Sequence, residues 1–261
     1  MTSVRDAIYP LCMTEPEPTW ESLPKNPALP EDEVHIWWVD LEQSTGQVDA
    51  FLRLLCDEER ERAGRFRSRE HGAHYAVARG TLRQLLGRYL GALPEKLAFS
   101  YGAHGKPDLA GCYGESGLRF NLSHSHQLAL FAVTWRREVG VDVEYPRPQV
   151  DIERLARRFF APVEVAALLS LPEERRREGF YNCWTRKEAY LKARGEGITV
   201  SLDSFAVSLA PGEPAELLSC DLDPGEVERW KLRALEARKG FAAAVCTEGS
   251  DWQLRCREWP E

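Results

Sequence analysis

The stretch on which the fold interpretation rests is Val139-Gly140-Val141-Asp142-Val143-Glu144. Valines at every second position are typical of a β-strand, in which residues i and i+2 point to the same side. The valines would face a core, and the carboxylates of Asp142 and Glu144 would project together from the other side. Paired hard oxygens suit Mg²⁺, which takes one or two carboxylates and leaves positions for phosphate and water. Taken alone, such a pair is more often a solvated strand face, so this alternative stays open.

On both sides of this strand the sequence predicts the same order of elements: a strand, helices, and further strands. In the first half we expect strands at 34–39, 97–101 and 128–133, helices at 48–55 and 75–90, and Asp57 as the N-cap of another helix. In the second half we expect helices at 152–159, from Pro162, and at 180–193, with strands at 205–209, 230–232 and 241–245. The order predicts an α+β fold of two similar α/β halves with pseudo-two-fold symmetry. Their expected bounds are 33–137 and 138–261, after a proline-rich irregular extension at 1–32.

A second motif lies in the last predicted helix and reads Trp184-Thr185-Arg186-Lys187-Glu188-Ala189-Tyr190-Leu191-Lys192. On a helix, Trp184, Glu188 and Leu191 form one stripe, and Lys192 lies one turn beyond Glu188. A carboxylate on an apolar stripe is costly to bury unless it meets a cation or a metal. An exposed Glu188–Lys192 pair is the simpler alternative. If Glu188 faces the strand of Asp142 and Glu144, three carboxylates converge and require a cation.

Other segments carry groups suited to phosphate. Phe120-Asn121-Leu122-Ser123-His124-Ser125-His126 reads as a donor-rich loop, and Tyr101-Gly102-Ala103-His104-Gly105-Lys106-Pro107 reads as a turn with Lys106 at its tip. Basic residues also cluster between Arg60 and Arg67, where neighbouring glutamates could neutralise them on a surface helix. For each of these segments, ordinary surface residues are the alternative.

Bulk composition limits the class of protein. A net charge of −7, from 34 basic and 41 acidic residues, argues against a protein devoted to nucleic-acid backbones. The seven cysteines are scattered and never spaced C-x-x-C, which argues against a disulfide framework or a zinc site and favours a reducing compartment. No run approaches the roughly 18 apolar residues of a membrane span. We therefore expect a cytoplasmic protein that binds neither nucleic acid nor membrane.

In combination, the motifs point to a family. Gly105-Lys106-Pro107, then 120–125, 139–144 and 184–192, resemble in wording and order the motif series of the 4′-phosphopantetheinyl transferases. The length and the two-half layout resemble the Sfp-type branch, and fit less well the shorter holo-acyl-carrier-protein-synthase branch, which works as a trimer of single halves. The resemblance runs from about residue 58 to residue 245.

The resemblance implies specific roles for residues. Asp142, Glu144 and Glu188 match the positions that surround Mg²⁺, or Mn²⁺ in its place, beside the coenzyme A (CoA) pyrophosphate. The positions that match CoA-binding residues of the family are Arg62, Lys106, Pro107, Ser123, His124, Asp142 and Lys192. His126 stands where relatives often have glycine, and we assign it no role.

The implied reaction is attack by a serine hydroxyl of an acyl or peptidyl carrier protein on the phosphorus that bears the pantetheine arm. Adenosine 3′,5′-bisphosphate leaves. Glu188 is the candidate base, or only a metal ligand, and Asp142 and Lys192 complete the catalytic set. The resemblance also implies a monomer, and carriers of fatty-acid, polyketide and nonribosomal-peptide synthesis remain alternatives.

Two other functions stay open at this point. One is a non-catalytic relative that holds CoA or a carrier protein without turnover. The other is a Mg²⁺-dependent phosphodiesterase or nucleotidyltransferase built on the same carboxylate pair, which would leave 105–107 and Ser123-His124 without a purpose.

Overall fold

The computed structural model describes residues 27–195 and 200–259, so most of the extension predicted at 1–32 lies outside the described residues. The helices and strands up to residue 135 are β1 (Glu33–Asp40), α1 (Thr45–Leu54), α2 (Asp57–Gly64), α3 (Arg69–Leu90), β2 (Ala98–Tyr101), β3 (Pro107–Ala110), β4 (Leu118–Ser125) and β5 (Leu128–Trp135). Those that follow are β6 (Val139–Glu144), α4 (Ile152–Phe159), α5 (Pro162–Ser170), α6 (Glu173–Arg194), β7 (Phe205–Val207), β8 (Leu217–Cys220), α7 (Glu226–Arg229), β9 (Trp230–Ala234), β10 (Ala242–Glu248) and β11 (Gln253–Glu258).

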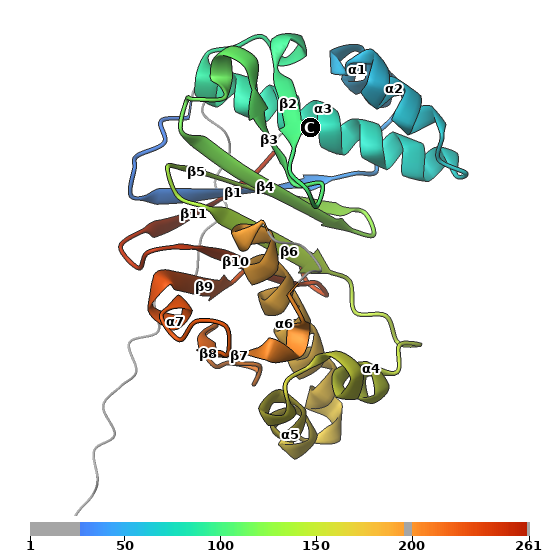
Figure 1. Cartoon of the computed structure of the whole chain (residues 1–261). Coiled ribbons are helices and arrows are strands. Elements are labelled where there is room, and N and C mark those ends of the chain that lie inside the picture. The colour runs from blue at the N-terminus through green and yellow to red at the C-terminus, as the bar shows by residue number, and fades with distance from the viewer. Residues whose placement is uncertain (1–26, 196–199, 260–261) are drawn as a thin grey trace, which may run out of the picture.

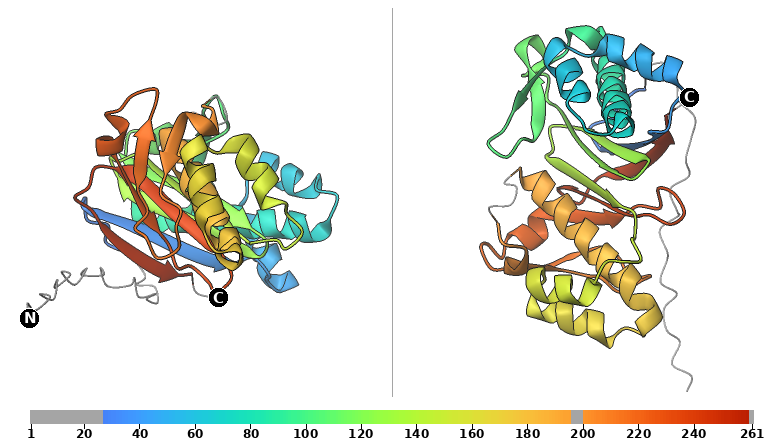
Figure 2. Two further views of the ribbon diagram at one scale, coloured as in Figure 1. Left: turned by 90° about the horizontal axis from the view of Figure 1, so that it is seen from below. Right: turned by 90° about the vertical axis from the view of Figure 1, so that its right-hand side faces the viewer.

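The elements stack as helix, sheet, sheet and helix (Figure 1). The four-stranded sheet has the order β11-β1-β5-β4 and is covered on its outer face by α3, while the three-stranded sheet has the order β6-β10-β9 and is covered by α6. Among the described residues, β2 with β3 and β7 with β8 form two further, two-stranded sheets. The views in Figure 2 agree on this layering. The prediction of an α+β fold is therefore confirmed. Within 27–195 and 200–259, no helix has the length and apolar character needed to cross a membrane.

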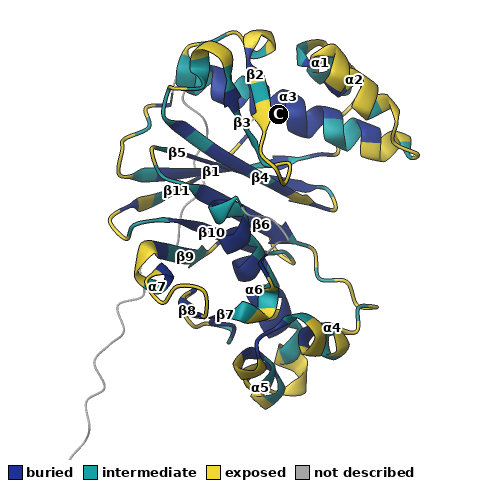
Figure 3. Ribbon diagram, in the orientation of Figure 1, coloured by how far each residue is buried: buried dark blue, intermediate teal, exposed yellow. Residues whose placement is uncertain are grey.

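Side chains alternate in direction along the central strands, and this alternation determines which of them enter each layer of the core. Leu128 and Leu130 of β5 face the layer between the two sheets, whereas Phe131 faces α3. Burial on both faces explains the continuous apolar run of this strand. Val141 and Val143 of β6 enter the same inter-sheet layer and are almost wholly buried, as the alternation predicts. In Figure 3 the sheets and the inner faces of α3 and α6 form one buried band.

Two local predictions are wrong. Residues 120–126 were expected to form a loop, but up to Ser125 they belong to β4, which pairs with β5 along its whole length. Serine and histidine favour turns only weakly, and the alternating burial of this segment determines its structure. Asp57 is the first residue of α2 and not its N-cap, because Cys56 occupies the capping position.

The strand β11 was not expected. It pairs in parallel with β1, so the end of the predicted second half lies in the sheet of the first half. The division at 33–137 and 138–261 and the pseudo-two-fold symmetry both stay predictions.

Gly140 allows α6 to lie directly on β6. A Cβ built on Gly140 would collide with the backbone atoms Ala189 O and Ala193 N of α6. Any larger residue must therefore push the helix away from the strand, and Glu188 and Lys192 would move with it. Only glycine permits such a close approach of two backbones.

We expect Gly140→Ala to lower the free energy of unfolding by about 2–3 kcal/mol, since overpacking at a backbone contact cannot be relieved by a rotamer change. Urea denaturation measures this difference. Gly46→Ala in α1 is the matched control, because nothing lies within 4 Å of a Cβ added there. Equal stability of the two variants would contradict the prediction.

Candidate functional site

Two serine–carboxylate pairs join β4 to β6 at the seam between the sheets. Ser123 Oγ donates to Asp142 Oδ1 at 2.8 Å, and Ser125 Oγ donates to Glu144 Oε2 at 2.9 Å. Because both strands alternate with period two, serines at i and i+2 meet carboxylates at i and i+2. Asn121 completes the seam, since its Oδ1 accepts the Val141 N–H at 2.9 Å. Asp142 and Glu144 thus lie on one face, as the alternation predicts.

Lys192 reaches from α6 to this seam. Its Nζ donates to Asp142 Oδ1 at 2.6 Å and to Ser123 Oγ at 2.9 Å. The helix contact with β6 therefore gives Lys192 a partner on the strand. Asp142 is only 4% exposed, and its other oxygen, Oδ2, is buried and makes no hydrogen bond within the described part of the chain. A buried carboxylate oxygen without a donor is costly, so this atom favours binding of a further cation.

Glu188 lies on the α6 face that meets the two carboxylates of β6. Burial raises the pKa of Glu188, and the negative charges of Asp142 and Glu144 raise it further, while Lys192 opposes them. Burial likewise raises the pKa of Glu144, whereas the hydrogen bond from Ser125 lowers it by a smaller amount. The structure thus brings the three predicted carboxylates within electrostatic reach of one another. Over the described ranges, however, no group of three His, Cys, Asp or Glu side chains is close enough to hold a metal ion.

A pocket of about 260 Å³ is lined by Glu188, but not by Asp142 or Glu144. Its walls come from the β2–β3 hairpin, from β4, from α6 and from the segment after α6; the lining residues are His104, Gly105, Lys106, Pro107, Asn121, Leu122, Glu188, Leu191, Lys192, Gly195, Val200 and Leu202. Four predicted site residues therefore line one cavity. A second hollow, of about 330 Å³ near Trp135, Arg136 and Glu248, is lined by none of the predicted site residues. The 260 Å³ pocket is therefore the candidate site.

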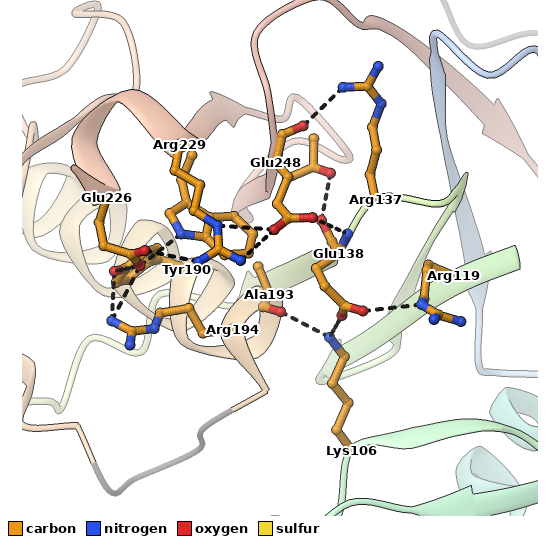
Figure 4. Close-up of polar contacts among 12 residues, drawn as sticks. Lys106, Arg119, Arg137, Glu138, Tyr190, Ala193, Arg194, Glu226, Arg229 and Glu248 are labelled. Atoms are coloured by element: carbon orange, nitrogen blue, oxygen red, sulfur yellow. Dashed lines mark hydrogen bonds and ion pairs between the residues drawn. The ribbon is translucent and has the colours of Figure 1, made fainter. Parts of the chain in front are cut away.

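Lys106 is not an exposed surface residue at the tip of a turn, which was the simpler alternative for this segment. Its Nζ donates to Glu138 Oε2 at 3.0 Å and to Ala193 O at 3.1 Å, across to the end of α6 (Figure 4). The turn itself is as predicted: Gly105 has φ of +79°, a backbone conformation that favours glycine.

His124 and Arg62 lie farther out. His124 is at the surface beyond Ser123, and partial desolvation, with the positive charge of Lys192 and of two histidines on α3, lowers its pKa. Arg62 is exposed on α2, and its guanidinium lies 5.3 Å from the centre of the Tyr75 ring. Arg62 is therefore outside the cluster at the seam.

Sequence reasoning missed three residues that build the site. Asn121 and Ser125 hold β6 in place, and their spacing around Ser123 could have shown one face of a strand. Glu138, the partner of Lys106, carries no local signal, because the two residues lie 32 positions apart in the chain.

Comparisons with known proteins match both parts of the chain to the same family. The family model described as "4′-phosphopantetheinyl transferase superfamily" matches residues 138–246, and one described as "4′-phosphopantetheinyl transferase, N-terminal" matches residues 40–136. The 4′-phosphopantetheinyl transferase HetI of Nostoc sp. is 43% identical over 235 residues, which cover 90% of this chain and 96% of that relative. The transferase psf-1 of Bacillus pumilus is 30% identical, with 80% of this chain and 85% of the relative covered. For Sfp of Bacillus subtilis the identity is 27%, with 82% and 92% covered.

Proposed function

This chain belongs to the 4′-phosphopantetheinyl transferase superfamily, and from that membership we propose how its carboxylate cluster transfers the 4′-phosphopantetheine arm of CoA to a serine of a carrier protein. The observation that carries the proposal is the environment of Asp142. One of its oxygens holds Lys192 and Ser123, and the other is buried without a donor. A site that pairs an ammonium with an unsatisfied carboxylate oxygen suits a phosphate bound together with a cation.

Binding of CoA is assigned to the pocket between the halves. Pro107 and its hairpin would form one wall, and Lys192 of α6 would face the phosphates from the other. Ser123 and His124 at the seam, and Arg62 at the outer end, would approach the nucleotide. The ammonium of Lys192 would compensate the charge of the pyrophosphate.

The residues at the seam fit Mg²⁺. Asp142 Oδ2 is available as a hard oxygen donor, and the carboxylates of Glu144 and Glu188 lie within electrostatic reach of it. When bound, such an ion would neutralise charge on the pyrophosphate oxygens and orient them. We propose Asp142, Glu144 and Glu188 as its ligands, because a cation relieves their mutual repulsion, although within the described residues the three side chains are not close enough to hold a metal ion as they stand.

Glu188 is the proposed general base. It would accept the proton of the carrier serine as the oxygen–phosphorus bond forms and the bond to adenosine 3′,5′-bisphosphate breaks. Without a bound cation, burial raises the pKa of Glu188, and the charges of Asp142 and Glu144 raise it further, which favours a role as a base. Trp184 and Leu191, one turn away on α6, belong to the hydrophobic core packed around this helix.

The proposal is tested by incubating the protein with apo carrier protein, CoA and Mg²⁺ and weighing the carrier. We expect a pantetheinyl mass increment and the release of adenosine 3′,5′-bisphosphate. Carriers of fatty-acid, polyketide and nonribosomal-peptide synthesis are tested in parallel. CoA binding without any increment on all of them would favour the non-catalytic alternative.

Removal of the metal is a separate prediction. Addition of EDTA in excess of Mg²⁺ should reduce transfer by at least about 100-fold, since charge on the pyrophosphate would no longer be neutralised. Restoring Mg²⁺, or adding Mn²⁺, should restore the rate, as measured by mass spectrometry over time. Transfer that persists in EDTA would refute the metal assignment and leave the transferase activity standing.

A further inference from the structure

We propose that Lys106 is a positioning residue, whose ammonium holds the β2–β3 hairpin against the end of α6 and so sets the shape of the CoA pocket. This inference rests on the function proposed above. It assigns Lys106 to the pocket wall, in place of direct contact with a phosphate of CoA.

The donors of the lysine are fully used within the protein. Nζ donates to Glu138 Oε2 at 3.0 Å, to Ala193 O at 3.1 Å and to Val139 O at 3.3 Å. An ammonium has three N–H groups, and three protein oxygens take them. No proton is left for a phosphate unless one of these bonds breaks. We call Lys106 with these three acceptors the clasp.

The position of the clasp fits the chemistry of a helix end. Ala193 O belongs to the last turn of α6, where unpaired carbonyls concentrate negative partial charge that favours a cation. The aliphatic part of Lys106 crosses the following turn, because its Cδ would lie 3.7 Å from a Cβ built on Gly195. The left-handed backbone of Gly195, with φ of +72°, ends the helix at this point. The lysine therefore closes the C-terminal end of α6.

The acceptor Glu138 is itself fixed in place. Arg119 Nε donates to its second carboxylate oxygen at 3.1 Å. The backbone N–H of Glu138 donates to Glu248 Oε2 at 3.2 Å, and Thr247 Oγ1 donates to the carbonyl of Glu138 at 2.6 Å. Figure 4 shows this chain of contacts running from Lys106 through Glu138 to Glu248. A flexible lysine is thus held by a rigid partner, as a positioning role requires.

The clasp joins walls that come from different parts of the chain. The two hairpin strands pack on each other, and β3 packs on β4. The facing wall belongs to α6, and the ammonium bridges the two across the pocket edge. Release of the bridge would let His104, Gly105 and Pro107 move relative to Lys192. CoA binding would then have to order this wall, and the entropy cost would lower the affinity for CoA.

The charge-neutral variant Glu138→Gln separates a clasp from a phosphate contact. If Lys106 acts through the clasp, Lys106→Met and Glu138→Gln each weaken CoA binding by about tenfold, and the double variant is no weaker than either single one. If Lys106 contacts phosphate directly, Lys106→Met weakens binding, whereas Glu138→Gln leaves it unchanged or tightens it, because a negative charge beside the pocket has gone. Titration calorimetry with CoA measures the dissociation constants.

Further readouts exclude a general loss of structure. We expect KM for CoA to rise with the dissociation constant, while kcat at saturating CoA stays within about threefold of wild type. Lys106→Arg should recover part of the affinity, because a guanidinium keeps charge and donors. Amide exchange should accelerate in the hairpin, where the Gly102 N–H donates to Lys106 O at 3.0 Å.

A matched control is Arg238→Gln. Arg238 donates to Asp40 Oδ2 at 2.8 Å, and this ion pair is partly exposed, like that of Lys106 with Glu138. It joins segments far apart in the chain, but neither residue lines the pocket. This variant should bind CoA like the wild type.

Two results would overturn the clasp: CoA affinity in Glu138→Gln that equals or exceeds wild type, or an effect of Lys106→Met confined to kcat. If Lys106→Met does not fold, Glu138→Gln still decides the question. A wild-type protein that neither binds CoA nor modifies a carrier would instead refute the proposed function itself, so the two failures are distinguishable.

Discussion

Replacing Asp142 with asparagine is expected to lower kcat/KM for pantetheine transfer by about 10³-fold or more. Asparagine has nearly the same shape, so Ser123 keeps an oxygen to which it can donate. The charge is lost, and with it the ion pair with Lys192 and the proposed site for a cation at Oδ2. Groups that stabilise developing charge in a dry site contribute factors of this size, equivalent to about 4 kcal/mol of transition-state stabilisation.

The rate is measured as the initial formation of modified carrier, followed by mass spectrometry, with thermal unfolding as the test of folding. Asp151→Asn serves as the matched control, because Asp151 caps α4 through the Arg154 N–H and asparagine caps a helix equally well. The control should retain full activity. An Asp142→Asn variant with more than about a tenth of wild-type activity would contradict the central role of this carboxylate.

Local periodicity predicts β6 of the site and the long helix α3, but it did not identify β4 as a strand. The alternation in 139–144 predicts β6 at its observed bounds and puts Asp142 and Glu144 on one face. The three- and four-residue spacing up to Leu90 predicts α3, which ends where Gly91 adopts a left-handed backbone. Both patterns are set by burial of one face, and burial is visible in the order of apolar residues.

Contacts between distant segments could not be predicted in this way. Nothing near Lys106 indicates that its partner is Glu138, and nothing near Ser125 indicates Glu144. These pairs form because β4 and β6 are edge strands of two different sheets that meet at the seam. The parallel pairing of β11 with β1 is a further example, since 220 positions separate Glu33 from Gln253. Such contacts depend on how the layers stack.

The motif 184–192 shows how function and folding share one helix. Glu188 and Lys192 line the pocket, whereas the adjacent Lys187 is buried in the core beside α6. Its Nζ donates to Leu202 O at 2.7 Å, to Phe205 O at 2.6 Å and to Glu164 Oε2 at 2.8 Å. Lys187 and Glu164 are each only 1% exposed. Two adjacent charged residues of one motif thus have different tasks, which their sequence alone does not separate.

We expect Lys187→Met to lower the free energy of unfolding by about 3–5 kcal/mol, because it leaves the buried charge of Glu164 without a counter-ion. Glu164 would keep the N–H groups of Ala161 and Val207 and the thiol of Cys183 as neutral donors. Urea denaturation followed by circular dichroism measures the change. Lys96→Met is the control, because Lys96 is exposed and should alter stability by less than about 0.5 kcal/mol.

The double variant Lys187→Met with Glu164→Gln tests the physical reason. Removing the second charge should recover part of the lost stability, since the cost of the single variant comes from an uncompensated charge more than from lost packing. A double variant less stable than Lys187→Met would show that contacts other than the ion pair matter more, such as those of the Lys187 ammonium with the rings of Phe160 and Phe205. A loss of less than about 1 kcal/mol in Lys187→Met would contradict the buried-pair account.

Lys187 also binds the carbonyl of Leu202, and Leu202 lines the pocket. In a folded Lys187→Met protein we therefore expect the affinity for CoA to fall more than kcat falls.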